Sequence, residues 1–458
     1  MLTGVPQVAV VGAGVAGLAA ALELQRAGVC VVVLEATDQV GGKVRASEVG
    51  GVLVDEGADS MLMRVPYGVE LAERAGLPLI SPTEGGAGVW TRGRVRPLPT
   101  GTVMGVPADL RSLAASGILP PAAFVRVLLD LVAGRRVHED VAVGPLVASR
   151  LGRAVRDLLV DPLLGGVYAG TADLLSLQAT VPTLAAAVAE HGSLLRAARA
   201  ARGTPADGPV FAGVEGGLGL LPPALARDLD VRLRTAVRGL ARTSTGWRLE
   251  TGSAAHPEAL DVEAVVLAVP AAPAAKLLGP HVPTQELAGV GYASVGIVTL
   301  VLDGPSPGWG SGYLVPAVEG RTTKAVTFTS RKWARTDATV VRASVGRYGE
   351  ERDLQRPDEE LVDLVLAELA AAVGPLPPLV DSRVTRWGGG LPQYAVGHLD
   401  LVGRLRRALP PGIAVAGAAY DGVGVPAVAR GGMEAAAQVL RLGAWPSPLP
   451  SPPSPRKS

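Results

Sequence analysis

The first hydrophobic pattern of the chain is an uninterrupted apolar run over residues 8–11, which is typical of a buried strand. A glycine-rich turn follows over residues 12–17, and an Ala- and Leu-rich stretch after it predicts a helix. A second apolar run, residues 29–34, predicts another buried strand and ends at Glu35. Strand, turn, helix and strand in this order predict the first unit of an α/β domain.

The period of the pattern changes twice in the middle of the chain. Residues 86–99 alternate as a β-hairpin does, with residues 91–94 as its turn. From about residue 108 to residue 202, apolar residues recur every three or four positions, which predicts a helical insertion. We expect this block to wall a substrate cavity, with a plain structural appendage as the alternative.

Strands and helices alternate again after residue 210. The pattern predicts a helix over 221–229, a strand over 231–237 paired as a hairpin with 246–249, and a buried strand over 264–269. It then predicts strands over 295–302, 324–330 and 340–345, followed by an amphipathic helix over 359–373. The last elements expected are a glycine-rich turn at 387–394, a strand at 413–416, a loop at 417–426 and a helix over 428–440.

These elements predict an α/β fold in which a Rossmann-like cofactor domain of three separated segments carries a mixed-sheet substrate domain and a helical insertion. The cofactor domain would comprise residues 1–85, 210–270 and 386–445. Residues 86–209 would form the hairpin and the helical insertion, and residues 271–385 the substrate domain. The Pro- and Ser-rich residues 446–458 are expected to be a disordered tail.

Composition supports a globular protein. The chain has 458 residues, of which 48% are hydrophobic and 19% charged, enough for two or three domains with large cores. The net charge of +1 gives no indication of a nucleic-acid partner. Cys30 is the one cysteine, so no internal disulfide can form, and we expect a buried structural thiol in a reducing compartment. The five histidines show no metal-ligand spacing, and we expect no metal.

No segment of the sequence indicates a membrane span or a signal peptide. The first apolar run is the predicted strand itself, and no stretch approaches 18 uninterrupted apolar residues. We therefore expect a cytoplasmic protein. Contact of the helical insertion with a membrane surface stays open.

Each part of the first glycine turn has a physical role in binding a dinucleotide. Gly12 allows the tight turn, Gly14 lets the backbone approach a diphosphate, and Gly17 lets the helix pack on the strand. The helix N-terminus offers unpaired N–H groups to the phosphates. Glu35 can accept hydrogen bonds from a ribose 2′-hydroxyl and would repel a 2′-phosphate.

Three further loops supply candidate contacts. The paired glycines at 41–42 free their amides for backbone contact, and Lys43 and Arg45 add positive charge near the diphosphate. Residues 55–60 are expected to form a second loop facing the phosphate and the ring of a longer cofactor. The loop at 417–426 precedes a helix and is another place for a phosphate or a ring oxygen.

Several longer motifs together resemble the protoporphyrinogen/coproporphyrinogen oxidase family, a branch of the flavin amine oxidase superfamily, and above all its soluble Gram-positive members. VAVVGAGVAGLAAAL and LEATDQVGGKVR are superfamily-wide, whereas the family is indicated by EGADSMLMR, RPLPTG, DPLLGGVYAGTADLLSLQA, RWGGGLPQYAVGH and GAAYDGVGVPAVARGGMEAA. The resemblance covers nearly the whole chain apart from the tail.

The resemblance implies noncovalent FAD and an oxidase of heme biosynthesis that uses O2 and releases H2O2. A porphyrinogen would lose six electrons in three flavin cycles, and the flavin would supply the redox chemistry, so no general base is assigned. The FAD contacts carried over by motif are Gly12, Ala13, Gly14, Val15, Ala16, Gly17, Glu35, Ala36, Gly42, Lys43, Gly57, Ala58, Asp59, Ser60, Val237, Trp387, Val423, Gly424 and Val425.

The implied substrate is a large apolar ring with propionate carboxylates, which needs an apolar slot and a few cationic side chains. Arg64 is the first candidate, and Arg92, Arg94, Arg96 and Lys332 are further ones. Coproporphyrinogen III is favoured over protoporphyrinogen IX because the chain shows no membrane anchor and its helical insertion resembles the soluble type. Transfer of the product to the next enzyme of the heme pathway is a further expectation.

Two other classes remain open at this point. A flavin amine oxidase-like enzyme or a desaturase would share the superfamily motifs, but amine oxidases generally need an aromatic cage and aromatics are only 3% of this chain. A non-catalytic flavin-binding protein could also retain the fold. Bleaching of the bound flavin by a porphyrinogen would distinguish an oxidase from such a protein.

Overall fold

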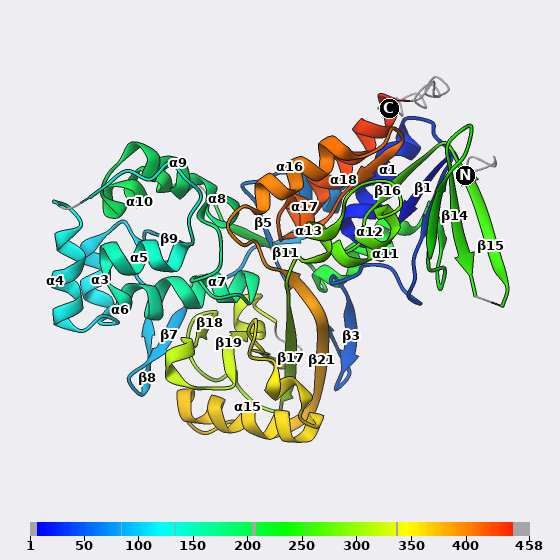
Figure 1. The fold of residues 1–458 in the computed structure, drawn as a ribbon. Coiled ribbons are helices and arrows are strands. Elements are labelled where there is room, and N and C mark those ends of the chain that lie inside the picture. The colour runs from blue at the N-terminus through cyan, green and yellow to red at the C-terminus, as the bar shows by residue number, and fades with distance from the viewer. Residues whose placement is uncertain are drawn as a thin grey trace, which may run out of the picture.

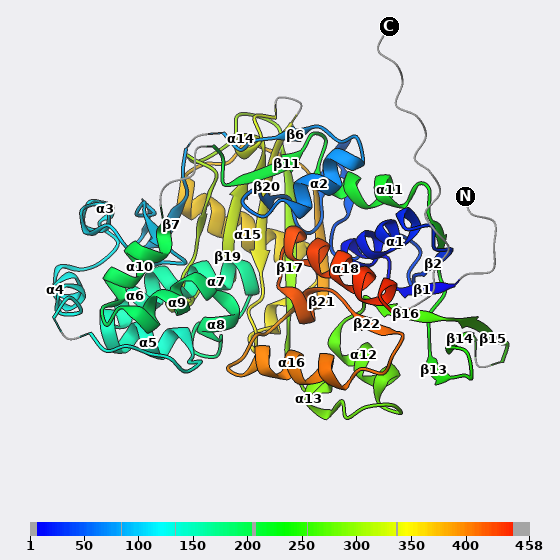
Figure 2. The ribbon, with the colours of Figure 1, turned by 90° about the horizontal axis from the view of Figure 1, so that it is seen from above.

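The computed structural model describes residues 7–83, 85–132, 134–203, 208–253, 255–335 and 338–442. The expected disordered tail, residues 446–458, lies outside the described residues. Figures 1 and 2 show three parts: an α/β part that contains β1 and α1, a sheet backed by α15, and a block of helices beside that sheet.

The α/β part is built on a parallel sheet. Among the described residues, five strands pair in the order β12-β2-β1-β16-β22. Their bounds are β12 Asp230–Arg232, β2 Val31–Leu34, β1 Val8–Val11, β16 Ala264–Leu267 and β22 Ile413–Val415. Every residue of β1 and β2 is buried, as expected for a parallel sheet covered on both faces. The sheet therefore joins three stretches that are far apart in the sequence.

Two helices cover one face of this sheet. α1 (Val15–Arg26) and α18 (Val425–Leu440) pack closely, because a Cβ on Gly432 would lie only 2.1 Å from the carbonyl oxygen of Ala16. Val8 and Val10 face these helices, whereas Ala9 and Val11 belong to the core on the opposite face. The opposite face is covered by α12 (Ala271–Leu278), α16 (His398–Ala408) and the sheet formed by β13 (Gly239–Arg242), β14 (Trp247–Gly252) and β15 (Pro257–Val262).

The predicted hairpin between residues 231–237 and 246–249 is wrong. β12 ends at Arg232 and pairs with β2 at the edge of the parallel sheet, whereas β14 pairs with β13 and β15. Arg234 has a φ of 53°, so the chain turns there instead of continuing the strand. The alternation of polar and apolar residues was real, but it could not show which strand is the neighbour.

The second sheet is mixed. Within the described ranges, seven strands pair in the order β21-β17-β20-β19-β18-β7-β8, antiparallel except for β18 with β7. Their bounds are β21 Leu379–Pro392, β17 Tyr292–Leu302, β20 Thr339–Val345, β19 Thr323–Phe328, β18 Gly312–Leu314, β7 Gly88–Thr91 and β8 Arg94–Pro97. α15 (Asp358–Val373) packs on this sheet, as Figure 1 shows. The predicted strands at 295–302, 324–330 and 340–345 and the predicted helix are confirmed within a few residues.

The glycine-rich residues 387–394 do not form the predicted turn. β21 runs from Leu379 to Pro392 beside β17, and the register shifts between Ala293 and Val295. Gly389 has a φ of 57° at this irregularity. The glycines therefore bend a long strand through a β-bulge without ending it.

The helical insertion is confirmed between residues 110 and 202. Its helices are α3 (Leu110–Ser116), α4 (Pro121–Leu129), α5 (Val143–Leu151), α6 (Arg153–Val155), the π-helix η1 (Arg156–Val160), α7 (Asp161–Tyr168), α8 (Leu177–Thr180), α9 (Pro182–Glu190) and α10 (Leu194–Arg202). They share one apolar core, and α7 contacts β18 and β19 of the mixed sheet. The block thus lies against the sheet on the side of α7 (Figure 2).

Short elements connect the three parts. The strands are β3 (Ala46–Val49), β4 (Val52–Asp55), β5 (Met61–Leu62), β6 (Leu79–Ile80), β9 (Thr102–Val103), β10 (Val106–Pro107) and β11 (Phe211–Val214). The helices are α2 (Tyr67–Arg74), η2 (Leu218–Leu220), α11 (Leu221–Ala226), α13 (Gln285–Ala288), η3 (Ala317–Glu319), α14 (Thr329–Lys332), η4 (Arg352–Gln355) and α17 (Ala418–Asp421). In the part of the chain that the structure describes, no helix combines the length and apolar character needed to span a bilayer.

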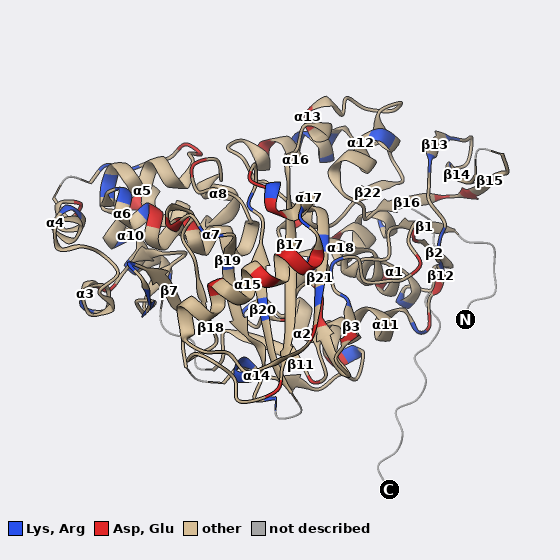
Figure 3. Cartoon of the chain, turned by 90° about the horizontal axis from the view of Figure 1, so that it is seen from below, with Lys and Arg blue, Asp and Glu red and all other residues tan. Residues whose placement is uncertain are grey.

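Charged residues of both signs are distributed over all three parts. Figure 3 shows Lys and Arg positions interspersed with Asp and Glu positions along the ribbon, including those on α15 and the strands beside it. This distribution agrees with the net charge of +1.

Candidate dinucleotide-binding and active site

The turn between β1 and α1 brings three glycines to the end of the parallel sheet. Gly12 has a φ of 102°, which favours glycine, and a Cβ there would lie 2.5 Å from the carbonyl oxygen of Ala268. A Cβ on Gly17 would lie 1.9 Å from the carbonyl oxygen of Gly12. Around Gly14, however, a Cβ would meet no protein atom within 4 Å. The turn is therefore packed tightly behind Gly14 and open in front of it.

The N-terminus of α1 has free hydrogen-bonding capacity. Its N-cap is Gly14, and no side chain caps the helix. The amides of Val15 and Ala16 in the first turn have no intrahelical acceptor, and the helix dipole adds partial positive charge. An anionic group in front of Gly14 would accept hydrogen bonds from these amides and would be attracted by the positive end of the helix dipole.

Glu35 lies directly after β2 and reaches back to the glycine turn. Its Oε2 atom accepts a hydrogen bond from the amide of Ala13 at 2.8 Å. Its Oε1 atom accepts from the amide and the hydroxyl of Thr37, at 2.9 and 2.8 Å. Because a carboxylate offers about four acceptor sites, capacity remains for a ribose hydroxyl. The neighbouring Ala36 is exposed.

Val237 lies on the link between β12 and β13, beside Glu35. The link passes the end of β2, where the amide of Thr235 donates to the carbonyl oxygen of Glu35 at 2.7 Å. Val237 packs against the core beneath the sheet, and its backbone forms no hydrogen bond with another described residue. It was expected in a strand. The extended link leaves its backbone available to an adenine edge.

The loop after β2 returns to the glycine turn. The amide of Gly41 donates to the carbonyl oxygen of Ala13 at 2.8 Å, and a Cβ on Gly42 would lie 3.4 Å from Cα of Gly14. Burial lowers the pKa of Lys43, whose ammonium has no hydrogen-bond or ion-pair partner among the described residues. A phosphate in front of Gly14 would supply the missing negative charge.

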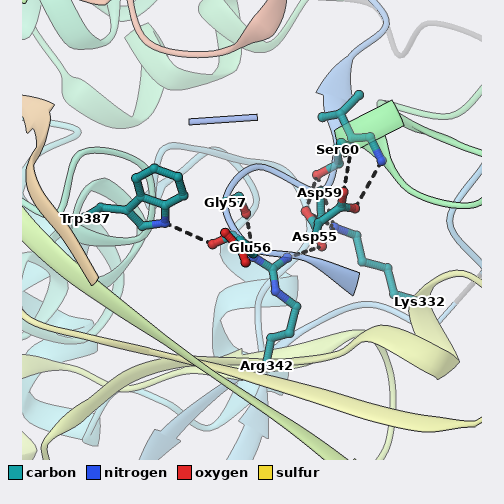
Figure 4. Close-up of polar contacts among 10 residues, drawn as sticks. Asp55, Glu56, Gly57, Asp59, Ser60, Lys332, Arg342 and Trp387 are labelled. Atoms are coloured by element: carbon teal, nitrogen blue, oxygen red, sulfur yellow. Dashed lines mark hydrogen bonds and ion pairs between the residues drawn. The ribbon is translucent and has the colours of Figure 1, made fainter. Parts of the chain in front are cut away.

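The chain segment after β4 contacts both Lys43 and Trp387. A Cβ on Gly57 would lie 2.0 Å from the carbonyl oxygen of Lys43 and 3.6 Å from Cζ2 of Trp387. The indole Nε1 of Trp387 donates to the carbonyl oxygen of Glu56 at 2.9 Å, as Figure 4 shows, and the amide of Ala58 donates to Lys43 at 3.4 Å. Residues distant in sequence thus form one continuous surface.

Arg45 has a structural role in this surface and does not add free charge near the diphosphate. Its guanidinium lies 4.5 Å from the ring centroid of Trp387 and pairs with Glu56 at 3.0 Å. Glu56 also contacts Arg383 at 3.5 Å. These contacts hold the indole in place.

Asp59 and Ser60 join this loop to the mixed sheet through a buried charge cluster. The Lys332 ammonium donates to both carboxylate oxygens of Asp59, at 3.0 and 3.1 Å, and to the Ser60 hydroxyl at 3.1 Å. Arg342 pairs with Asp59 at 3.4 Å and donates to the carbonyl oxygen of Gly57 at 2.5 Å (Figure 4). Burial alone would raise the pKa of Asp59, but the charges of Lys332 and Arg342 hold that pKa below its ordinary value.

The N-terminus of α18 forms the far end of the site. Its N-cap is Gly424, which has a φ of 103°, no protein atom within 4 Å of a Cβ, and no side-chain cap. Val425 is buried and Val423 is half-buried against the helical block. A Cβ on Gly68 of α2 would lie 2.9 Å from the sulfur of Met61 and 3.2 Å from Pro426. The start of α18 therefore lies beside the segment that follows Ser60.

The two open helix N-termini are separated by a distance that suits a long cofactor. α18 contacts α1 through Gly432, seven residues after its own first residue, Val425. At 1.5 Å per residue, α18 begins about 10 Å before this contact. A dinucleotide could place its diphosphate at α1 and its second ring near the start of α18. Glu35 and Val237 would then hold its adenosine end.

The structure places the candidate substrate residues in different surroundings. Arg64 is exposed on the turn between β5 and α2, three residues after Met61, and has no side-chain partner among the described residues. Lys332 is instead bound to Asp59 and Ser60, with 15% of its side chain exposed. Arg64 is thus available to a ligand, whereas Lys332 supports the loop.

The three hairpin arginines lie at the opposite edge of the mixed sheet from Trp387. β8 is the last strand and β21 the first of the seven, which corresponds to about 29 Å at 4.8 Å per strand. Arg92 donates to the carbonyl oxygens of Gly117 and Ile118, and Arg94 is exposed. Burial and the nearby arginines lower the pKa of Arg96. These side chains are not brought together with Trp387.

Sequence reasoning missed Arg342, which helps to organise the site. Arg342 looked like an ordinary strand residue, yet it contacts both Gly57 and Asp59. An arginine within an apolar strand was the available signal. Asp55, expected in the loop at residues 55–60, instead ends β4 and accepts hydrogen bonds from the amides of Leu218 and Gly219, at 3.1 and 2.7 Å.

Comparison with known protein families defines the class to which this chain belongs. The family model of flavin-containing amine oxidoreductases matches residues 15–440. The chain belongs to this family and is an oxidoreductase with a flavin cofactor. The open space at Gly14, the unpartnered Lys43 and the uncapped starts of α1 and α18 fit such a group.

The relatives within the family are more specific. The chain is 37% identical over 433 residues to coproporphyrinogen III oxidase of Mycobacterium tuberculosis (strain ATCC 25618 / H37Rv), which covers 91% of this chain and 94% of that protein. It is 28% identical over 454 residues to coproporphyrinogen III oxidase of Bacillus subtilis (93% and 96% covered) and 28% identical over 480 residues to protoporphyrinogen oxidase of Bos taurus (94% and 98%). The resemblance to the protoporphyrinogen/coproporphyrinogen oxidase family is confirmed.

Solved structures agree with this assignment. A crystal structure from Exiguobacterium sp. 255-15, assigned as a protoporphyrinogen oxidase, has a TM-score of 0.85 and 31% identity, and covers 95% of this chain and 99% of that one. UDP-galactopyranose mutase has a TM-score of 0.73 at 18% identity, covering 96% of each chain. The second likeness concerns the fold alone, so the fold by itself does not name the reaction.

Proposed function

We propose that this chain oxidises coproporphyrinogen III to coproporphyrin III in heme biosynthesis. The observation that carries the proposal is the 37% identity to a coproporphyrinogen III oxidase across 91% of the chain, combined with the site that joins Gly14, Trp387 and Gly424. The cofactor would be noncovalent FAD. Its adenosine half matches the glycine turn and Glu35, and the open N-terminus of α18 is available to its ring.

The overall reaction would remove six hydrogen atoms from each porphyrinogen. Bound FAD would accept two electrons per cycle and pass them to O2, so that three O2 become three H2O2 for each porphyrin formed. The chain itself would position the cofactor through the loops at Gly14, Gly57 and Gly424. Asp59, held by Lys332 and Arg342, would keep the Gly57 loop in place without reacting.

The helical block and the mixed sheet would together wall the substrate cavity. α7 contacts β18 and β19, and Ala169 at its end lies in one apolar cluster with Val295 and Trp387. An apolar wall next to the indole suits a large hydrophobic ring. Arg64, exposed near the start of α18, would pair with a propionate at the rim.

Replacement of Arg64 by Ala is expected to raise KM for coproporphyrinogen about tenfold or more, because a charge-assisted hydrogen bond contributes about 1.5–3 kcal/mol. The flavin spectrum should not change, since Arg64 has no contact with the Gly57 loop in this structure. Steady-state kinetics and an absorbance spectrum check this. Arg94→Ala is the matched control, because Arg94 is also exposed but lies on the distant hairpin. An unchanged KM in the Arg64 variant would remove this residue from the substrate site.

The alternative substrate is protoporphyrinogen IX, which carries two propionates instead of four. Measuring kcat/KM for both porphyrinogens under air distinguishes the two. We expect a preference for coproporphyrinogen III. A clear preference for protoporphyrinogen IX would overturn the substrate assignment and leave the oxidase assignment intact.

A further inference from the structure

A buried lysine, Lys324, occupies a position in β19 that no cofactor or fold requirement explains. Its exposed fraction is 6%, and its ammonium forms no hydrogen bond or ion pair with another described residue. Lysine is rarely buried without a partner, because removing its charge from water is costly. The Nζ atom itself is not completely enclosed by protein, so a ligand could reach the ammonium.

The position of Lys324 in the sheet links it to the active site. Register pairs Arg386, the neighbour of Trp387, with Gly296, Gly296 with Val345, and Val345 with Thr323, so these four residues form a row across β21, β17, β20 and β19. Lys324 follows Thr323 at a register irregularity of β19. Three strand spacings place it about 14 Å from Trp387. It lies at the end of the sheet that meets the helical block.

A second cation lies next to Lys324. Arg347 follows β20, and its guanidinium donates to the carbonyl oxygens of Arg321 and Val315, at 3.3 and 3.1 Å. It forms no ion pair among the described residues, and a guanidinium has five donors, so capacity remains. Its neighbour Tyr348 donates its amide to Ala169 at the end of α7, at 2.7 Å, and packs in the cluster that contains Trp387.

No negative charge among the described residues compensates the positive charge of Lys324. Burial, and after it the positive charge of Arg347, lowers the pKa of Lys324 to about 7. No carboxylate in the described part of the chain offsets this effect. Burial lowers the pKa of Arg347, and the negative charges of Glu350, Asp161 and Glu368 partly offset this effect, although none of the three forms a direct ion pair with Arg347. Lys324 is thus left without a counter-ion where the sheet meets α7, whereas Arg347 has carboxylates nearby but no direct ion pair with them.

We infer that Lys324 and Arg347 form an anion subsite that binds one propionate carboxylate of the substrate at the side of the cavity away from Arg64. This inference rests on the proposed function, because the carboxylate is that of a porphyrinogen. A carboxylate between the two cations would accept hydrogen bonds from both and supply the negative charge that Lys324 lacks. A ring lying against Trp387 would then be held at two places on its rim.

The test uses the FAD-loaded protein and the variant Lys324→Met. Affinity for coproporphyrin III is measured by fluorescence titration. KM and kcat are measured by steady-state kinetics with coproporphyrinogen III. We expect a 10- to 100-fold weaker affinity and a similarly raised KM, since a charged hydrogen bond is lost, with kcat near that of the wild type. Lys324→Arg should restore most of the affinity. Lys276→Met on the exposed face of α12 should behave as the wild type.

The melting temperature separates substrate binding from a structural role. Removal of an unpaired buried charge should leave the melting temperature of Lys324→Met unchanged or raise it. A lower melting temperature, or an affinity equal to that of the wild type, would overturn the subsite. If the wild type neither binds coproporphyrin III nor oxidises the porphyrinogen, the proposed function fails together with the subsite. An active wild type with an unaffected variant overturns the subsite alone.

Discussion

Replacement of Gly14 by Val is expected to give a folded but colourless protein without activity. Gly14 has a φ of −71° and a ψ of 173°, which Val adopts readily, and a Cβ there meets no protein atom within 4 Å. The substitution therefore does not strain the chain itself. The branched side chain would occupy the open space where the diphosphate approaches the backbone. Affinity for FAD should fall about 5- to 160-fold, because an overpacked contact costs about 1–3 kcal/mol.

Two glycine variants serve as controls for this experiment. Gly403→Val on α16 also meets open space, its nearest atom being Nη1 of Arg407 at 3.6 Å, and it should purify yellow. Gly17→Val should fail to fold, because its Cβ would overlap the carbonyl oxygen of Gly12. Absorbance of the purified protein and circular dichroism measure cofactor content and folding. A yellow, active Gly14→Val protein would refute the diphosphate site.

Replacement of Asp59 by Asn is expected to destabilise the protein by about 3 kcal/mol or more, because it leaves two buried cations without a counter-ion. Asp59 and Lys332 each expose 15% of the side chain, and Arg342 exposes 8%. The loss should appear as a lower melting temperature and a lower urea midpoint, with wild type and variant compared at the same FAD occupancy. A melting temperature equal to that of the wild type would show that the cluster contributes little.

An exposed ion pair provides the matched control. Asp261 accepts two hydrogen bonds from Arg248 at 2.7 Å each, but both side chains are more than half exposed. Asp261→Asn should therefore change stability by about 1 kcal/mol at most.

The pH dependence of the Asp59 contribution follows from the lowered pKa. Because that pKa is lower in the folded than in the unfolded state, the stabilisation is fully present above the ordinary carboxyl pKa of about 3.9. It is lost as the pH falls through the folded value. The difference in melting temperature between wild type and Asp59→Asn should accordingly be constant at neutral pH and shrink in acid. A difference that persisted unchanged below this range would contradict the charge-based account.

The sequence predicted the elements whose signals are local. Neighbouring residues alone were enough to predict the strands β1 and β2, the three glycines between them and the role of Glu35. The helical period likewise predicted the block from α3 to α10. In each case, the buried face of a helix or strand determines the spacing of apolar residues along the sequence.

Features that depend on partners distant in sequence could not be predicted in this way. The glycines after Trp387 suggested a turn, but pairing with β17 converts them into a bulge within β21. Residues 231–237 alternated correctly, yet the neighbour of β12 is β2 and not β14. Local alternation contains no information about which strand lies alongside.

The prediction of substrate-binding lysines and arginines from the sequence was limited in the same way. Lys332 was proposed for the substrate because its type suits a carboxylate, but a carboxylate of the protein, Asp59, already occupies it. The hairpin arginines also suit a carboxylate by their type, but the sheet places them at the edge opposite β21. Lys324 gave no local signal, because only the tertiary structure shows that it is buried without a partner.

The central claim is that this chain carries FAD and passes electrons from coproporphyrinogen III to it. Addition of coproporphyrinogen III to the purified yellow protein without oxygen tests it most directly, with the flavin absorbance followed in time. We predict that the absorbance bleaches, and that admission of air restores it while coproporphyrin fluorescence appears. A flavin that stays oxidised in the presence of excess coproporphyrinogen III would contradict the claim.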